Sequence, residues 1–231
     1  MKKIGIIGAM AEEVEKLKQS FELEEIVKIL DYEFYLVKYE DKEIVIVVSG
    51  IGKVNAAICA QIMIMKFDVE CIVNSGIAGA IDEKLNITDI IISKDLLQHD
   101  FDCTGFGYEA GIIPRMGEDS IFKGDEKLLE KIEKAAKENN IDYKIGRIAT
   151  GDQFISTNEK KMWIKDTFNA TCAEMESAAI AQTCFINKIP FLAIRCISDT
   201  ADERAEMVYT EFEKIAIEKC YSITHTFIKE Y

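Results

Sequence analysis

Residues 190–199 read Pro-Phe-Leu-Ala-Ile-Arg-Cys-Ile-Ser-Asp, and this stretch decides the fold class. Every residue from Phe191 to Ile197 is apolar except Arg195, and a proline precedes the run. Such a run is typical of a strand that is covered on both faces, as in a sheet flanked by helices. The sequence therefore predicts an α/β protein in which 191–197 is a central strand.

The rest of the chain alternates between patterns typical of strands and patterns typical of helices. We expect further strands at 3–9, 26–30, 33–39, 42–49, 70–75, 88–95 and 144–150. We expect helices at 12–17, 53–66, 125–139, 158–166, 173–187 and 209–229, and a glycine-rich loop at 105–124. No linker rich in Pro, Gly or Ser interrupts the alternation. The sequence thus predicts one α/β domain over residues 1–231, with a mixed central β-sheet flanked by helices.

The composition is that of a globular protein with a negative charge. Hydrophobic residues make up 48% and charged residues 30% of the 231 residues, and the formal net charge is −13 at pH 7. This surplus of acids repels phosphate backbones and anionic lipids, so we expect neither nucleic acid nor a membrane as a partner. The few arginines are Arg115, Arg147, Arg195 and Arg204, which leaves little capacity for bidentate binding of phosphate.

The cysteines are expected to be reduced thiols in the core. They are scattered along the chain without a CxxC pair, so we expect no zinc or iron–sulfur site. The apolar run from Ile4 to Gly8 is too short for a signal peptide, and no stretch approaches the ~20 apolar residues that cross a bilayer. These features predict a cytoplasmic protein.

Ligands in α/β sheets bind at the carboxyl ends of strands. The expected strands end at 8–13, 49–53, 75–79, 150–154 and 197–202. The glycine patterns there are weak. Gly50-Ile51-Gly52-Lys53 resembles the end of a phosphate-binding loop, but valines stand where its first glycine and its Ser or Thr belong. A tight turn into a helix is the simpler explanation of these glycines.

Acidic residues at the strand ends are more informative. Asp199 follows the central strand beside Ser198, where an acid lies at the mouth of a site and its pKa can be tuned; a helix cap would use the same residues. Glu174 and Glu176 lie two apart at the start of the helix expected over 173–187. They complement the helix dipole, but one of them must face the apolar side, where a buried carboxylate needs a partner.

Glu12 and Glu13 repeat this arrangement after the first expected strand, and again a helix start explains them without a function. Acids at three strand ends of one sheet are less easily explained by coincidence than each pair alone. The sequence therefore predicts a cluster of carboxylates at one edge of the sheet.

Motifs in each part of the chain carry a family resemblance. They are Gly5–Val14 (GIIGAMAEEV), Ser49–Val54 (SGIGKV), Phe106–Glu109 (FGYE), Gly151–Ile155 (GDQFI), Ala173–Ala181 (AEMESAAIA) and Arg195–Asp199 (RCISD). In this order they resemble the 5′-methylthioadenosine/S-adenosylhomocysteine nucleosidases, which belong to the purine nucleoside phosphorylase superfamily. The resemblance covers nearly the whole chain.

The resemblance implies a nucleoside phosphorylase-like fold and hydrolysis of an N-glycosidic bond. The implied substrates are 5′-methylthioadenosine and S-adenosylhomocysteine, with 5′-deoxyadenosine as a third candidate, and the products are adenine and the 5′-thioribose. Such an enzyme serves methionine salvage and adenosylmethionine recycling in the cytoplasm. The resemblance also implies a homodimer, no cofactor and no metal.

The resemblance assigns catalytic roles to five residues. Asp199 would be the general acid at adenine N7, and Ser198 would hold its orientation. Glu13 would position and deprotonate the water, and Arg195 would help to organise that region. Glu176 would bind the ribose hydroxyls. These roles meet the two needs of the reaction, a protonated leaving base and an aimed water.

The resemblance also assigns substrate contacts. Met175 would pack under the sugar, Phe154 would stack on the adenine, and the backbone at Ile155 would read the adenine edge. The apolar 5′ pocket would be lined by Met10, Ile51, Tyr209 and Pro114, and further substrate contacts would come from Ile77, Ala78, Gly79 and Ala201. Phe106, Tyr108 and Pro114 would reach into the site of the partner subunit.

One position departs from the family pattern. Where the family usually has Ser-Ala-Gly, this chain has Ile77-Ala78-Gly79, so a hydroxyl that helps to hold the water is missing. The departure predicts either a slower reaction or a related nucleosidase with a different substrate.

Three other functions stay open. A phosphate-dependent nucleoside phosphorylase would need a cationic cradle, whereas Glu12 and Glu13 follow the first strand and arginine is scarce. An aminodeoxyfutalosine nucleosidase would apply the same chemistry to another substrate. A catalytically silent nucleoside-binding protein would account for Ile77, but the presence of Glu13, Glu176 and Asp199 speaks against it.

Overall fold

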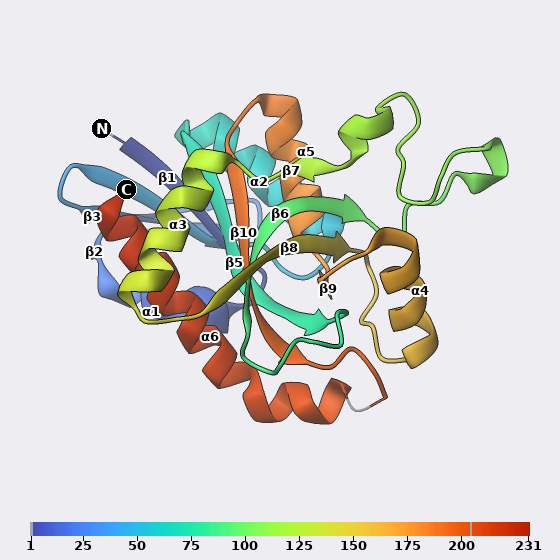
Figure 1. The fold of residues 1–231 in the computed structure, drawn as a ribbon. Helices are drawn as coiled ribbons and strands as arrows, with labels where there is room; N and C mark the ends of the chain where they lie inside the picture. Colours follow the sequence, from blue (N-terminus) through green and yellow to red (C-terminus); the bar gives the residue numbers. More distant parts are fainter. Residues whose placement is uncertain (1, 204) are drawn as a thin grey trace.

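The computed structural model describes residues 2–203 and 205–231, without the side chains of residues 206–211. Its centre is a ten-stranded β-sheet with helices on both faces (Figure 1). The strands are β1 (Lys2–Gly8), β2 (Glu22–Ile29), β3 (Tyr32–Tyr39), β4 (Lys42–Val48), β5 (Cys71–Ala80), β6 (Ile90–Gln98), β7 (Phe122–Lys123), β8 (Tyr143–Thr150), β9 (Cys172–Glu174) and β10 (Phe191–Asp199). The helices are α1 (Ala11–Ser20), α2 (Lys53–Phe67), α3 (Glu126–Glu138), α4 (Asn158–Phe168), α5 (Ser177–Asn187) and α6 (Ala205–Glu230), with short 3₁₀ helices η1 (Thr104–Phe106) and η2 (Gly117–Ser120). The predicted α/β class and mixed sheet are confirmed.

Part of the sheet closes on itself. Strand β10 pairs in parallel with β5 and antiparallel with β6, and β6 leads through β8 and β9 back to β5. The sheet extends from β5 through β1 and β4 to β3 and β2. Because β1, β4, β5 and β10 run parallel, their carboxyl ends lie at the same edge, where α/β proteins bind ligands.

The two faces of the sheet carry separate apolar cores. Helices α2 and α5 cover one face, where Met63 is fully buried, and α1, α3 and α6 cover the other, where Phe227 is fully buried. Successive residues of β1 point into different cores: Ile6 faces the α6 side and Ile7 the α2 side. This follows from the two-residue period of a strand and explains why the central strands are apolar throughout.

One expected helix is shorter than the sequence predicts. Of the segment 173–187, only α5 is helical; Ala173 and Glu174 belong to β9, and Met175 and Glu176 form a bend between the two elements. Strand β9 pairs antiparallel with β5 and parallel with β8, and these sheet hydrogen bonds outweigh the helix propensity of Ala-Glu-Met-Glu. The expectation that Glu174 and Glu176 occupy two faces of a helix is therefore wrong.

Strand β5 continues beyond its predicted end at residue 75. It runs to Ala80 because β10 pairs with it as far as Gly79 and β9 pairs with its last residues. The glycine-rich segment 75–79 thus lies inside the sheet and not at a strand end, which corrects the expectation for this segment. The backbone groups of residues 75–79 can therefore contribute to a binding site from inside the sheet.

Other elements differ from the prediction mainly at their ends. Strand β2 begins at Glu22 and not at 26, β6 ends at Gln98 and not at 95, and α6 begins at Ala205 and not at 209. Among the described helices, none is long and apolar enough to cross a membrane. The described residues include no group of three or more His, Cys, Asp or Glu placed to hold a metal ion.

Two methionines of α2 test the packing of this helix. Met63 is 0% exposed, so Met63→Ala leaves a cavity and is expected to lower the free energy of unfolding by about 2–5 kcal/mol. Met65 is 78% exposed, and Met65→Ala is expected to change it by less than about 0.5 kcal/mol. Urea denaturation measures both. Equal losses in the two variants would contradict the placement of α2.

Candidate active site

A cavity of about 330 Å³ lies at the carboxyl edge of the parallel strands. Residues from β5, β9, β10 and the segments that follow β1, β4 and β8 line it: Ala9, Met10, Glu13, Ile51, Ile77, Ala78, Gly79, Phe154, Ala173, Glu174, Met175, Glu176, Ser198 and Asp199. The acids predicted at separate points of the sequence therefore meet in one cavity. Each of these carboxyl groups has different hydrogen-bond partners and a different pKa shift, and these differences determine its possible chemical role.

Glu13 is buried in the first turn of α1 and accepts three backbone hydrogen bonds. Its Oε2 accepts from the N–H groups of Ala9 at 2.7 Å and Met10 at 3.0 Å, and its Oε1 accepts from Ile77 at 3.2 Å. Burial raises the pKa of Glu13, although the charge of Arg195 and the three N–H groups oppose the rise. Glu13 is thus a fixed carboxylate that binds a proton more readily than an exposed glutamate does.

Asp199 ends β10 and is almost fully buried. Its Oδ1 accepts from the N–H of Ala201 at 2.9 Å, and its Oδ2 accepts from the hydroxyl of Ser198 at 2.9 Å. A Cβ at Gly79 would lie 2.7 Å from Oδ1, so the absence of a side chain there makes room for this carboxyl. Burial raises the pKa of Asp199 against these hydrogen bonds. Asp199 is therefore placed to hold a proton inside the cavity.

Glu176 lies at the turn that precedes α5. Its Oε1 accepts from the N–H of Gly52 at 2.8 Å, which brings the start of α2 to the cavity. Gly52 has φ +97°, a conformation that residues with a side chain rarely adopt. Burial and the negative charge of Glu174 raise the pKa of Glu176 to about 8. The Glu176 carboxyl is thus held at one oxygen by the backbone of another segment.

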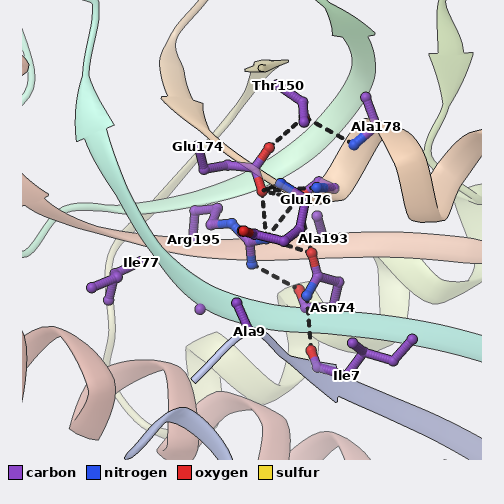
Figure 2. A network of polar contacts seen from close by, with 12 residues as sticks. Ile7, Ala9, Asn74, Ile77, Thr150, Glu174, Glu176, Ala178, Ala193 and Arg195 are labelled. Atoms are coloured by element: carbon purple, nitrogen blue, oxygen red, sulfur yellow. Dashed lines mark hydrogen bonds and ion pairs between the residues drawn. The ribbon is translucent and has the colours of Figure 1, made fainter. Parts of the chain in front are cut away.

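Glu174, which lines the cavity, forms a buried ion pair with Arg195 (Figure 2). A guanidinium nitrogen of Arg195 lies 2.7 Å from Glu174 Oε2 and also donates to the hydroxyl of Ser177 at 2.7 Å and to the side chain of Asn74. The hydroxyl of Thr150 donates to the other oxygen of Glu174. Burial alone would raise the pKa of Glu174, but Arg195 and these hydrogen-bond donors lower it by more, so the net shift is downward.

Arg195 was predicted to help organise the region around Glu13. In the structure its guanidinium donates hydrogen bonds to Glu174, Ser177, Asn74 and its own strand, and its charge lowers the pKa of Glu13. The guanidinium is 2% exposed in β10 and is neutralised by Glu174. It therefore stabilises the cavity wall and acts on Glu13 through its charge.

The other predicted contact residues fall into three groups. Met10, Ile51, Ile77, Ala78, Gly79, Phe154 and Met175 line the cavity, with Glu13, Glu176, Ser198 and Asp199. Ile155 and Ala201 are buried in a small apolar cluster with α4, next to lining residues. Phe106, Tyr108 and Pro114 belong to the segment between β6 and β7, which projects from the body of this chain (Figure 1). The side chain of Tyr209 lies outside the described residues.

Three polar residues of the site were missed from the sequence. Asn74, Thr150 and Ser177 all bond to Glu174 or Arg195 and are buried. The available signal was a polar side chain inside an apolar strand, as at Asn74, because a buried amide needs partners. No local pattern indicated that these partners would be an ion pair from β9 and β10.

The fold and the carboxylate cavity agree with comparisons to known proteins. The model of the phosphorylase superfamily matches residues 3–229, and the chain belongs to this superfamily. A 5′-methylthioadenosine/S-adenosylhomocysteine nucleosidase from Staphylococcus aureus (strain JH9) is 43% identical over 222 residues, which is 95% of this chain and 96% of the relative. Within the superfamily, the chain therefore belongs to the methylthioadenosine/adenosylhomocysteine nucleosidase family.

Solved structures show the same fold. The nucleosidase of the same name from Helicobacter pylori superimposes with a TM-score of 0.95 at 33% identity, covering 100% of this chain and 99% of that one. A structure described as futalosine hydrolase from Helicobacter pylori strain 26695 also has a TM-score of 0.95 at 33% identity, over 100% of this chain and 98% of that one. The fold alone does not distinguish these two names.

Removing the charge of Glu174 tests the electrostatics of the cavity. Glu174→Gln is expected to lower the pKa of Glu176 from about 8, because a neighbouring negative charge is lost and Arg195 is left unpaired. The unpaired arginine is also expected to cost about 3–5 kcal/mol of stability. Titration of ¹³C-labelled glutamate carboxyls by NMR measures the shift.

The matched control is Asp95→Asn, which breaks a different Arg–carboxylate pair, Arg147–Asp95 at 2.5 Å. This change is expected to leave the titration of Glu176 as it is. An unaltered titration of Glu176 in Glu174→Gln would contradict the assigned coupling.

Proposed function

We propose that this chain is an N-ribosyl hydrolase that cleaves 5′-methylthioadenosine and S-adenosylhomocysteine to adenine and the 5′-thioribose. The observation that carries the proposal is the convergence of Glu13, Glu176 and Asp199, with raised pKa values, on one cavity. Among the residues described at its wall, none is a lysine or an arginine. Such a cavity suits an uncharged nucleoside and a water molecule.

Asp199 is the proposed general acid. Its raised pKa favours the protonated form, and transfer of this proton to adenine N7 makes the base a better leaving group as the C1′–N9 bond breaks. The Ser198 hydroxyl, 2.9 Å away, and the Ala201 N–H fix the direction of the carboxyl. The acid is thereby held ready in the orientation that the transfer requires.

Glu13 is the proposed base for water. Its three backbone hydrogen bonds keep the carboxylate in one position, and its raised pKa improves it as a proton acceptor. Water attacks C1′ of the oxocarbenium-like sugar and gives a proton to Glu13, while adenine carries the proton from Asp199. Exchange with solvent then restores both carboxyls.

Glu176 and apolar side chains supply binding. The free oxygen of Glu176 is proposed to bind the ribose hydroxyls, with Met175 against the sugar. Phe154 is 51% exposed at the cavity, where an adenine ring would cover it. Met10 and Ile51 give an apolar wall for the 5′-thioether.

A partner subunit is proposed to complete the site. Phe106 is 87% exposed on the segment between β6 and β7, and Tyr108 and Pro114 follow it in the same segment. An exposed phenylalanine on a projecting segment is typical of an interface residue. We propose a homodimer in the cytoplasm, with a role in methionine salvage and amino-acid biosynthesis.

Incubation with 5′-methylthioadenosine separates hydrolysis from phosphorolysis. We expect adenine and free methylthioribose at the same rate with and without phosphate, because the described cavity wall offers no cation to hold an anion. Chromatography of the products measures both. Release of adenine that requires phosphate would show a nucleoside phosphorylase instead.

Aminodeoxyfutalosine hydrolysis is the second candidate. The observation in its favour is the equal structural similarity to the futalosine hydrolase from Helicobacter pylori, and Ile77 in place of the expected serine is compatible with a changed substrate. The same assay with aminodeoxyfutalosine decides the matter. A higher kcat/KM for it than for the thioether nucleosides would make it the main substrate.

Asp199→Asn tests the general acid. The amide keeps the size of the side chain but has no proton to give, so kcat is expected to fall by about 10²–10⁴-fold while the melting temperature stays near that of the unmodified protein. Asp166→Asn, on the exposed surface of α4, is the control and keeps full activity. Near-normal turnover in Asp199→Asn would show that another group protonates the base.

A further inference from the structure

A closed ring of polar contacts joins three segments beside the cavity. Asp100, which follows β6, places Oδ1 2.6 Å from the ammonium group of Lys53, and its Oδ2 accepts from the backbone N–H of Asp152 at 2.9 Å. The carboxylate of Asp152, which follows β8, accepts from the backbone N–H of Lys53 at 2.7 Å. Each residue thus contacts both of the others, although they are far apart in the sequence.

The ion pair in this ring is largely shielded from water. The side chains of Lys53 and Asp100 are 17% and 16% exposed. Burial raises the pKa of Asp100, but Lys53 and the Asp152 N–H lower it more, so Asp100 is ionised at neutral pH. Gln98 Oε1 accepts a second hydrogen bond from Lys53 at 3.1 Å and its amide donates to Gln182 at 2.6 Å. The ammonium group of Lys53 is therefore held by Gln98, at the end of β6, and by Asp100, which follows that strand.

Two of the three segments in the ring carry a residue of the cavity. Gly52, directly before Lys53, donates its N–H to Glu176, and Ile51 lines the cavity. Phe154 follows Asp152 by two residues and lines the same cavity. A Cβ at Gly52 would lie 3.1 Å from Asp152 Oδ1, so the ring also depends on close approach of these two segments.

The ring accounts for the weak phosphate-loop pattern at Gly50–Lys53. At the start of α2, the N–H of Gly52 is bound by Glu176 and the N–H of Lys53 by Asp152. The ammonium group of Lys53 is bound by Asp100. Carboxylates of the chain itself thus occupy the donors that a phosphate would need, and the motif serves to fasten α2 to the cavity.

We propose that Asp100 is a positioning residue, which through Lys53 and Asp152 fixes two segments: the start of α2, whose Gly52 N–H holds Glu176, and the segment after β8, which presents Phe154 to the substrate. The proposal rests on the proposed function, because it assigns to these two side chains the binding of ribose and adenine. Asp100 itself is absent from the cavity lining, so its proposed effect on the substrate is indirect.

This role predicts a particular kinetic change. Loss of the ring lets the α2 start and the segment after β8 move, so binding of the nucleoside weakens. Glu13 and Asp199 are held by β1, β5 and β10, which the ring does not contact. Asp100→Asn is therefore expected to raise KM about tenfold and to change kcat less than about threefold.

Asp95→Asn is the matched control. Asp95 lies on β6, the strand that Asp100 follows, and its ion pair with Arg147 joins β6 to β8. The side chains of Asp95 and Arg147 are 12% and 28% exposed, so this pair is also partly shielded from water. It is expected to lower the melting temperature but to leave KM unchanged. An equal rise of KM in both variants would reduce the ring to a purely structural role and overturn the proposal.

A double-mutant cycle of Asp100→Asn and Lys53→Met provides the second test, and the single variant Lys53→Met, with the same expected rise of KM, replaces Asp100→Asn should that variant not fold. If the ring acts as a unit, the double variant has the KM of either single variant and not the product of their effects. Fully additive effects, or an unchanged KM in Asp100→Asn, would overturn the proposal. Failure of the unmodified protein to cleave any of the nucleosides would instead overturn the proposed function.

Discussion

The buried ion pair between Arg195 and Glu174 is the constraint on which the rest of the site depends. Both charges are removed from water, which costs several kcal/mol for each ion, and only close pairing and further hydrogen bonds offset this cost. Among the described residues Arg195 Nε finds no partner, but the other nitrogens of the guanidinium and both oxygens of Glu174 do. The partners come from other elements: Asn74 from β5, Thr150 from β8 and Ser177 from α5. The need to satisfy one ion pair therefore fastens the closed part of the sheet to the helix that follows Glu176.

This pair also determines the charge of the cavity. Burial and the negative charge of Glu174 raise the pKa of Glu176 to about 8, and the positive charge of Arg195 opposes this rise only in part. Burial raises the pKa values of Glu13 and Asp199, whereas the charge of Arg195 and hydrogen bonds lower the pKa of Glu174. Carboxyls whose environments push their pKa values in opposite directions can take different roles in one reaction. A structural acid and three acids that bind protons readily thus share one small volume.

The sequence predicted what depends on local pattern. The apolar run before Asp199 indicated a central strand, and the acids at strand ends were expected at one edge of the sheet, where the structure places them. It failed where pairing between distant segments decides the outcome. Strand β9 forms because two other strands offer hydrogen bonds, and neither the roles of Asn74 and Thr150 nor the contact of Asp100 with Lys53 can be read from neighbouring residues.

The second half of β5 decides where the carboxyls of Glu13 and Asp199 lie. Side chains are absent at Gly76 and Gly79, and the space a Cβ would take is filled by Glu13 and Arg195 at the first position and by Asp199 at the second. The N–H of Ile77, between them, binds Glu13. Strand β5 pairs with both β1 and β10, with a shift in the β10 register between Ile197 and Asp199, so the separation of the proposed base and the proposed acid follows from the pairing of these strands. The segments that follow β4 and β8 carry the proposed binding contacts and are joined by their own hydrogen bond between Lys53 and Asp152, so binding and chemistry are held by different parts of the structure.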